Sequence, residues 1–175
     1  MDFYEVIKKR RSVRSFSEKI PPLEVIEKII GTARLAPTWA NMQGVEYIII
    51  REPGMVNQIW QAIGQGNKFS SAPIFIMGII SERGSGKNAK SGLQYFMVDF
   101  GICFDHLILA ATAEGLATCW IGFFDEKKIK EILEIPNKFR VIGITPLGYA
   151  KKEYEPTPRK NLEKIMHYER YKGNK

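Results

Sequence analysis

Three arginines and a serine lie within five residues near the start of the chain, in the segment Arg10-Arg11-Ser12-Val13-Arg14. A guanidinium group binds phosphate through two parallel hydrogen bonds, and a serine hydroxyl adds a further donor. The segment could therefore wrap a dianionic phosphate monoester. The alternative is a solvated basic patch, which is common in a chain with 26 Lys and Arg residues.

The position of Arg10 favours the phosphate site. Residues 2–10 are predicted to form a helix whose apolar face contains Phe3, Val6 and Ile7. Arg10 continues that same face at the helix end. Because an unpaired charge is costly to bury, we expect an anion beside it.

Helices and strands alternate along the rest of the chain. Helices are expected from Pro21-Pro22 to just before Pro37, at 55–63, from Leu93 to Gly115, at 125–133 and at 161–168. Strands are expected at 45–50, 74–80, 117–121 and 139–149. The segment 37–44 is a polar loop, and 81–91 is a mobile loop by composition. The helix from Leu93 is apolar almost all round, so it should pack on several sides or against a second subunit.

The composition fits one folded domain that spans residues 1–175, because 45% of the chain is hydrophobic and neither a repeat nor a linker interrupts it. The pattern alone is compatible with an α/β or an α+β fold. Residues 151–175 form a charged C-terminal extension without an obvious core of its own. The start of the chain lacks the apolar centre of a signal peptide, and no run approaches about 18 uninterrupted apolar residues, so no membrane segment is expected.

Two further observations bear on location and partners. Cys103 and Cys119 each lie in an apolar run, which predicts buried free thiols and a reducing, cytoplasmic compartment. The net charge is +7, but 19 acidic residues are interspersed with the basic ones and the aromatic residues follow core patterns. We therefore expect no nucleic-acid partner.

Other catalytic motifs are incomplete. Gly84-Ser85-Gly86-Lys87 resembles part of a P-loop but lacks the first glycine at the right offset, and Gly64-Gln65-Gly66 lacks the third glycine of a dinucleotide fingerprint. His106 and His167 join no cluster with metal-ligand spacing, and no nucleophile elbow is present. No metal site and no hydrolytic site are predicted.

Four segments together resemble the nitroreductase family. Arg10 to Arg14 is similar to the family's N-terminal FMN motif, and Pro37-Thr38-Trp39-Ala40-Asn41-Met42-Gln43 to its Pro-Ser-x-x-Asn-x-Gln loop. Gly115-Leu116-Ala117-Thr118-Cys119-Trp120-Ile121-Gly122 resembles its Gly-Leu-Gly-Thr-Cys-Trp-Ile-Gly segment, and Pro158-Arg159-Lys160 its C-terminal basic motif. The matches occur in family order. The chain departs from the pattern at Gly44-Val45, where the family often has Pro-Trp, and at Thr38, where Ser is usual.

The resemblance implies an α+β fold with a central mixed, mostly antiparallel sheet flanked by helices, and a homodimer that holds FMN at its interface. It places Arg10, Arg11, Ser12, Arg159 and Lys160 around the FMN phosphate, with Arg14 and Asn67 at the pyrimidine edge of the flavin. It also places Thr38, Asn41 and Gln43 of the partner subunit beside the flavin, with Trp120, Ile121 and Gly122 along the ring and the Gly122 N–H at N5. The side chains of Cys119 and Ile121 are expected to pack in the core.

The resemblance further implies an FMN-dependent oxidoreductase. It would take a hydride from NAD(P)H and pass it through flavin N5 to a small organic acceptor such as a nitroaromatic or a quinone, with ping-pong kinetics. Because the flavin supplies the chemistry, no side chain is predicted to act as acid or base. A specialised flavin enzyme that dehalogenates or breaks down flavin, and a flavin-binding protein without turnover, remain alternatives.

Overall fold

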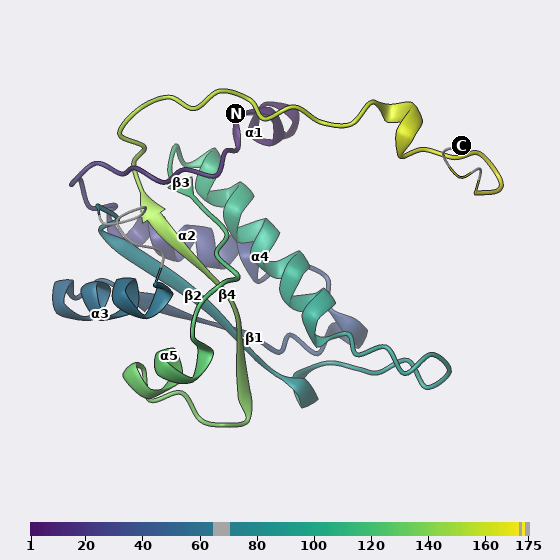
Figure 1. Cartoon of the computed structure of the whole chain (residues 1–175), viewed down its shortest axis with the longest axis horizontal. Helices are drawn as coiled ribbons and strands as arrows, with labels where there is room; N and C mark the ends of the chain where they lie inside the picture. The colour runs from purple at the N-terminus through teal and green to yellow at the C-terminus, as the bar shows by residue number, and fades with distance from the viewer. Residues whose placement is uncertain (65–70, 172, 174–175) are drawn as a thin grey trace.

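The computed structural model describes residues 1–64, 71–171 and 173. Within these residues the centre is a four-stranded sheet in the order β1-β2-β4-β3, formed by β1 at Val45–Ile50, β2 at Ile74–Ser81, β3 at Ala117–Thr118 and β4 at Phe139–Gly148 (Figure 1). Each neighbouring pair is antiparallel. A parallel bridge joins Ser12 to Thr118 at the β3 edge. The expected mixed, mostly antiparallel sheet is confirmed.

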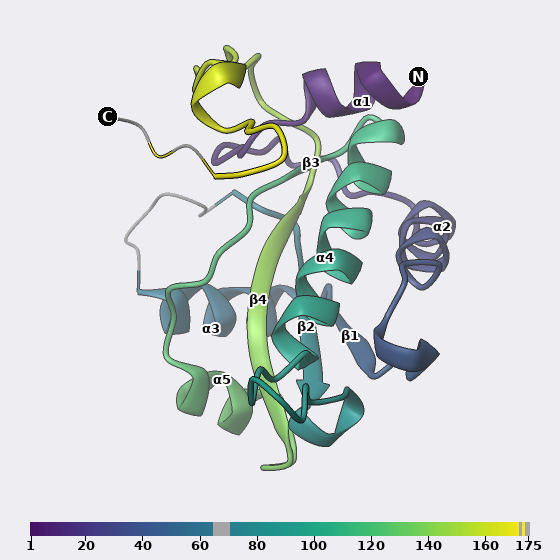
Figure 2. The same ribbon diagram turned by 90° about the vertical axis from the view of Figure 1, so that its right-hand side faces the viewer.

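Helices cover both faces of this sheet (Figure 2). One face packs against α2 (Leu23–Ala33) and α4 (Phe96–Ala113), and the other against α3 (Pro53–Ile63) and α5 (Glu126–Ile132). The short helix α1 (Phe3–Lys9) contacts α4. The fold is therefore a three-layer α+β domain, as the resemblance implied.

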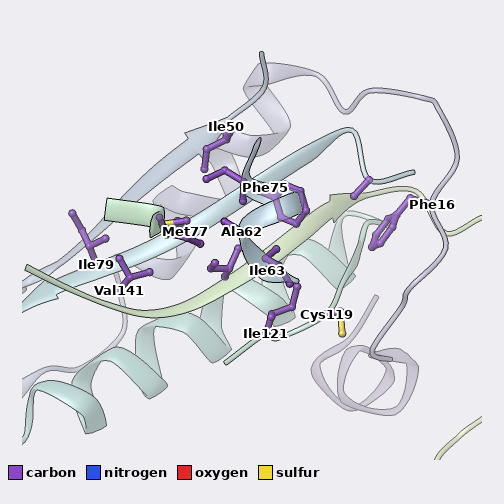
Figure 3. Packing of buried hydrophobic residues seen from close by; sticks show 14 of the residues in the cluster. Phe16, Ile50, Ala62, Ile63, Phe75, Met77, Ile79, Cys119, Ile121 and Val141 are labelled. Carbon is purple, nitrogen blue, oxygen red and sulfur yellow. The ribbon is translucent and has the colours of Figure 1, made fainter. Parts of the chain in front are cut away.

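The strand β2 supplies both cores, which explains its continuous apolar sequence. Phe75, Met77 and Ile79 point into the cluster with α3 and α5, as Figure 3 shows. Alternate residues such as Ile74 and Ile76 point into the cluster with α2 and α4. Because successive strand residues face opposite sides, a central strand between two helical layers is apolar at every position.

The long apolar helix begins at Phe96 rather than at Leu93 and ends as predicted. Gly115 takes a left-handed φ of 75° after the last turn, and the N–H groups of Gly115 and Leu116 donate back to Thr112 and Ala111. This is the Schellman arrangement, which satisfies the last carbonyl groups of a helix. The helix contacts α1, α2 and the sheet, so the prediction of packing on several sides is confirmed.

The helix α4 is long and apolar enough to cross a membrane by length and composition alone, although Asp99 and Asp105 interrupt its apolar sequence. Half of the segment is buried inside the fold. That burial is typical of the core helix of a folded domain.

Three local predictions are wrong. The apolar face of α1 is not a buried stripe, because Phe3 is 66% exposed, Ile7 is 46% exposed and Val6 alone of the three is buried. Residues 161–168 form only the 3-10 turn η4 at Leu162–Lys164, and their apolar side chains Leu162, Ile165 and Tyr168 are exposed rather than packed on the core of the described residues. The segment 81–91 is more structured than its composition suggests: it begins with the 3-10 turn η3 at Glu82–Gly84 and is tied to α4.

The C-terminal extension leaves the sheet at the end of β4, turns back and runs out from the body of the domain (Figure 1). Most of its side chains are exposed, including the apolar Leu162, Ile165 and Tyr168. Exposed apolar side chains gathered on an extended arm are typical of a segment that packs on another molecule.

Candidate functional site

The arginine-rich segment lies against the edge strand β3. The N–H of Val13 donates to the Thr118 carbonyl at 2.8 Å, next to the parallel bridge between Ser12 and Thr118. This pairing fixes the register of the two segments that the sequence analysis selected separately. A cavity of about 250 Å³ lies at the junction, lined by Arg10, Ser12, Asp105, Ile108, Thr118, Cys119 and Trp120.

The arginines of this segment form no ion pair with any residue in the described part of the chain. The Arg11 guanidinium turns back to the end of α1, where it donates to the carbonyl groups of Lys8 and Arg10. Its Nε is buried and lacks a partner among the described residues. A buried donor without an acceptor costs free energy, so this atom indicates a missing acceptor.

Arg10 is half-buried and caps the C-terminal end of α1, where its N–H donates to the Val6 carbonyl at 2.9 Å. The sequence analysis expected an anion beside Arg10 because Arg10 would end a buried apolar stripe, and that stripe is wrong. The position of Arg10 at the 250 Å³ cavity favours an anion beside it on separate grounds. Arg10 also borders a second cavity of about 640 Å³, whose basic residues include Lys9, Arg11 and Lys152.

The pKa of the Cys119 thiol reflects the positive charge of the arginine-rich segment. Burial raises the pKa of Cys119, while Arg14, the Ser12 hydroxyl and Arg10 act on it in the opposite direction. The positive charges of Arg10 and Arg14 therefore act on the region of this thiol. Cys119 was expected to be a packing residue only, and it is buried, but it also lines the 250 Å³ cavity.

The segment after β3 supplies an aromatic wall and an exposed backbone amide. Trp120 is 41% exposed and packs edge-on against Phe104 and Phe100, with ring centroids 4.8 and 5.9 Å away. Gly122 is exposed, and within the described residues its N–H forms no hydrogen bond. Ile121 points into the core beside Ile63, as Figure 3 shows, so its side chain is excluded from the cavity and only its backbone is near.

The polar loop 37–44 is held by a buried carboxylate of α4. Asp99 is 2% exposed and accepts the Trp39 N–H with both oxygens, at 3.0 and 3.1 Å. It also accepts the Ser85 hydroxyl at 2.6 Å. The Trp39 ring lies 4.5 Å from that of Tyr95 and directly over Gly86, where an added Cβ would fall 2.1 Å from the indole nitrogen.

The backbone of this loop is strained. Ala40, Asn41 and Gln43 have φ of 45°, 56° and 52°, in the left-handed region that non-glycine residues avoid. Each such residue costs roughly 1–2 kcal/mol. Hydrogen bonds within the loop oppose that cost, since the Gln43 N–H donates to Thr38 Oγ1 at 3.0 Å and its side chain donates to the Asn41 carbonyl at 3.2 Å. The loop holds the exposed side chains of Asn41 and Gln43 in one arrangement.

A small cavity of about 120 Å³ lies behind this loop and is lined by Thr38 and Gln43 together with Tyr47 and Cys103. The Tyr47 hydroxyl is buried and has no partner among the described residues. Burial raises its pKa, with a smaller contribution from Cys103, so the phenol is neutral at physiological pH.

The remaining predicted site residues are not brought to the cavity. Arg159 and Lys160 are exposed on the extension, and the Arg159 guanidinium donates to the carbonyl groups of Thr157 and Pro158. Arg14 is exposed, with its N–H 3.3 Å from the Tyr154 hydroxyl. Asn67 lies outside the described residues.

Comparison with known proteins decides the family. The sequence profile of the nitroreductase family matches residues 7–76 and 64–149. The chain belongs to the nitroreductase family. The structure of a nitroreductase family protein from Clostridium difficile 630 is similar over 98% of this chain and 100% of its own, with a TM-score of 0.89 and 31% identity.

Two further relatives of this nitroreductase family member bear on its chemistry. An Archaeoglobus fulgidus protein named "Putative NADH dehydrogenase/NAD(P)H nitroreductase" is 29% identical over 168 residues, which is 92% of this chain and 94% of that protein. Oxidised iodotyrosine deiodinase, solved with FMN and 3-iodo-L-tyrosine, shares the fold with a TM-score of 0.81 and 22% identity over 96% of this chain and 99% of its own. The family and the name of the Archaeoglobus relative support oxidoreductase activity, and the deiodinase structure shows the shared fold.

Three residues of this nitroreductase site escaped sequence reasoning. Asp99 could have been suspected, because it is a carboxylate in the first turn of a mostly apolar helix. Ser85 was considered only as part of an incomplete P-loop in a polar segment, and its bond to Asp99 was not predicted. Thr145 is buried in β4, where its hydroxyl accepts the Cys119 N–H at 3.0 Å, and nothing in the local pattern indicates that role.

Proposed function

We propose that the protein is an FMN-dependent oxidoreductase that carries electrons from NAD(P)H to small organic acceptors such as nitroaromatics or quinones. One observation carries the proposal most strongly. Arg10, which forms no ion pair in the described part of the chain, meets a serine hydroxyl and an exposed tryptophan around one cavity, and Arg11 lines a second cavity that Arg10 also borders. A phosphorylated, electron-accepting ring system supplies what each of these groups lacks.

The donor set fits FMN. The phosphate needs several cationic or hydroxyl donors, and Arg10, Arg11 and Ser12 would supply them, with Arg159 and Lys160 reaching from the extension. The buried Nε of Arg11 lacks an acceptor among the described residues, and a phosphate oxygen is one acceptor of suitable chemistry. The anchored Thr38, Asn41 and Gln43 of a second subunit would bind the ring from the other side. Asn67 remains part of the proposal on family resemblance alone.

When bound, FMN accepts a hydride at N5 and delivers it to a second substrate. The protein's own residues orient the ring and set its electrostatics. A guanidinium at the pyrimidine edge, the role proposed for Arg14, favours the negative charge of the reduced ring and raises its potential. The free N–H of Gly122 would orient the ring at N5, and Trp120 would form the wall beside it.

The proposal includes a homodimer. The apolar face of α1 and the apolar residues of the extension are exposed, although the domain has a complete core without them. A second copy that covers these surfaces would also bring the loop around Asn41 to the cavity. We propose a single domain over residues 1–175 whose extension contributes to the dimer and to the phosphate site, in a cytoplasmic protein without a nucleic-acid or membrane partner.

The test begins with an absorption spectrum of the purified protein and identification of the released chromophore. A flavin spectrum that yields FMN is expected, with NAD(P)H oxidation that follows parallel-line, ping-pong kinetics for a nitroaromatic or quinone acceptor. Arg14→Ala should lower the flavin potential and weaken FMN binding. Arg51→Ala, at an exposed site outside both basic cavities, is the matched control and should change neither. A colourless protein that refuses added FMN would refute the proposal.

The same test separates the alternatives. A flavin-binding protein without turnover would be yellow, yet would fail to oxidise NAD(P)H with any acceptor. A specialised dehalogenase is suggested by the fold shared with iodotyrosine deiodinase. Reduced enzyme that releases iodide from 3-iodo-L-tyrosine, but leaves nitroaromatics and quinones unchanged, would favour that alternative.

A further inference from the structure

The ladder between β4 and the segment after β3 is interrupted at one position. Ala117 pairs with Gly148 and Thr118 with Leu147. Further along, Ile121 and Ile144 exchange both hydrogen bonds, at 2.8 and 3.0 Å. The intervening register sets Cys119 opposite Pro146. Since hydrogen-bonded pairs alternate along an antiparallel ladder, Cys119 and Pro146 should form the next mutually bonded pair.

That pair cannot form completely, because Pro146 has no N–H to donate to the Cys119 carbonyl. The other half of the pair is also altered. The Cys119 N–H donates to Thr145 Oγ1 at 3.0 Å, and Thr145 Oγ1 in turn donates to the Pro146 carbonyl at 2.8 Å. The hydroxyl therefore stands between the donor and the acceptor that a regular ladder would join directly.

Thr145 is 0% exposed, so water cannot replace its hydroxyl without a rearrangement. We propose that Thr145 is a positioning residue: its hydroxyl spaces the backbone at Cys119 from β4, between the pairs at Thr118 and Ile121, and so fixes where Trp120 and the Gly122 N–H meet the flavin. The inference rests on the proposed flavin function. It differs from that function in assigning a role to a residue that touches none of the cavities described above.

The geometry distinguishes three replacements. Thr145→Ser keeps the hydroxyl and should preserve the spacing. Thr145→Val puts a methyl group where the hydroxyl was, so the Cys119 N–H and the Pro146 carbonyl both lose their partner and cannot approach each other. Pro146→Ala supplies the missing N–H while leaving Thr145 in place, and should draw the segment toward β4.

The experiment measures two quantities on the purified full-length protein. The first is FMN affinity together with the midpoint potential of the bound flavin, and the second is hydrogen exchange of the 117–122 peptide by mass spectrometry. Thr145→Val should weaken FMN binding at least tenfold and speed exchange in that peptide. If affinity for one redox state falls tenfold more than for the other, the two-electron potential moves by about 30 mV. Thr145→Ser should stay within about threefold of the wild type in affinity.

A matched control separates positioning from loss of stability. Ile129→Val removes one buried methyl group in α5, and should lower the unfolding temperature without a change in potential or in exchange of the 117–122 peptide. If Thr145→Val fails to fold, Pro146→Ala gives the test, with slower exchange in the peptide and weaker FMN binding expected. A folded Thr145→Val, or Pro146→Ala in its place, with wild-type affinity and potential would overturn the inference and leave the flavin function standing. If the wild type binds no FMN, the function fails, and peptide exchange alone then decides whether Thr145 holds the segment.

Discussion

Replacing Asp99 tests whether one buried carboxylate holds the loop that carries Thr38, Asn41 and Gln43. The Asp99 oxygens accept the Trp39 N–H and the Ser85 hydroxyl, and no other part of the described chain offers these two donors an acceptor. In Asp99→Leu both donors lose their acceptor inside a site that water does not reach. We expect the variant to fold with a loosened loop and a lower unfolding temperature.

The magnitude follows from the contacts. A buried donor left unsatisfied costs about 1–3 kcal/mol, so two donors cost about 2–6 kcal/mol. Part of that cost is recovered, because the leucine carries no charge to desolvate and because the loop can relax its left-handed residues. A net loss of about 3 kcal/mol lowers the unfolding temperature of a domain of this size by roughly 6–12 °C. Asp99→Asn keeps one oxygen and should lose less than half as much.

The assay is thermal unfolding of the three proteins followed by circular dichroism, with hydrogen exchange of residues 38–44 measured alongside. Glu27→Gln, at an exposed position of α2, is the control for loss of a carboxylate and should unfold like the wild type. If Asp99→Leu unfolds within 2 °C of the wild type, or if exchange in the loop is unchanged, then Asp99 does not hold the loop and the reasoning from its hydrogen bonds is refuted.

Two other predictions use simple substitutions. Gly86→Ala should destabilise the fold by about 1–3 kcal/mol, because the added Cβ would overlap the Trp39 indole. Gly31→Ala places its Cβ in open space on α2 and should raise the free energy of unfolding by up to about 1 kcal/mol. Chemical denaturation of both variants measures the contrast, and equal effects would contradict it. The pKa of Glu126 is lowered overall: partial burial would raise it, but the Arg140 guanidinium and a backbone N–H outweigh that effect. The Glu126 carboxylate therefore adds stability at pH values above its ordinary pKa of 4.5, and this contribution is lost as the pH falls through the lower pKa of the folded state. The difference in unfolding free energy between wild type and Glu126→Gln should therefore shrink between about pH 6 and pH 3. A difference that stays constant would contradict the assignment.

The sequence predicted most elements because their boundaries have local causes. The helix α2 follows Pro21-Pro22 and ends before Pro37, and β2 is an uninterrupted apolar run of strand length. Each of these signals lies within the element that it predicts or a few residues from its ends. The family resemblance then supplied the topology, which periodicity alone left open between α/β and α+β.

The errors concern interactions that cross the chain or leave it. A strand was expected at 117–121, but β3 proper contains only Ala117 and Thr118, because Pro146 in the facing strand cannot complete the next pair. The apolar pattern of α1 was correct as a pattern, yet whether such a face is buried depends on what covers it. The left-handed residues Ala40 and Gln43 were not foreseen, since neither is a residue type that usually takes that conformation.

The location of the cavity follows from the unusual edge strand. The strand β3 has only two residues. One edge of it pairs with the arginine-rich segment through Ser12, and along the other edge the ladder with β4 is interrupted at Cys119. A regular strand in place of Cys119 to Gly122 would gain a backbone hydrogen bond and draw the segment toward β4. The backbone at Cys119, and with it the exposed indole of Trp120, would then move toward β4. The interrupted ladder therefore sets where the segment that lines the cavity lies, and a substitution that repairs the ladder should stabilise the sheet while it weakens the site.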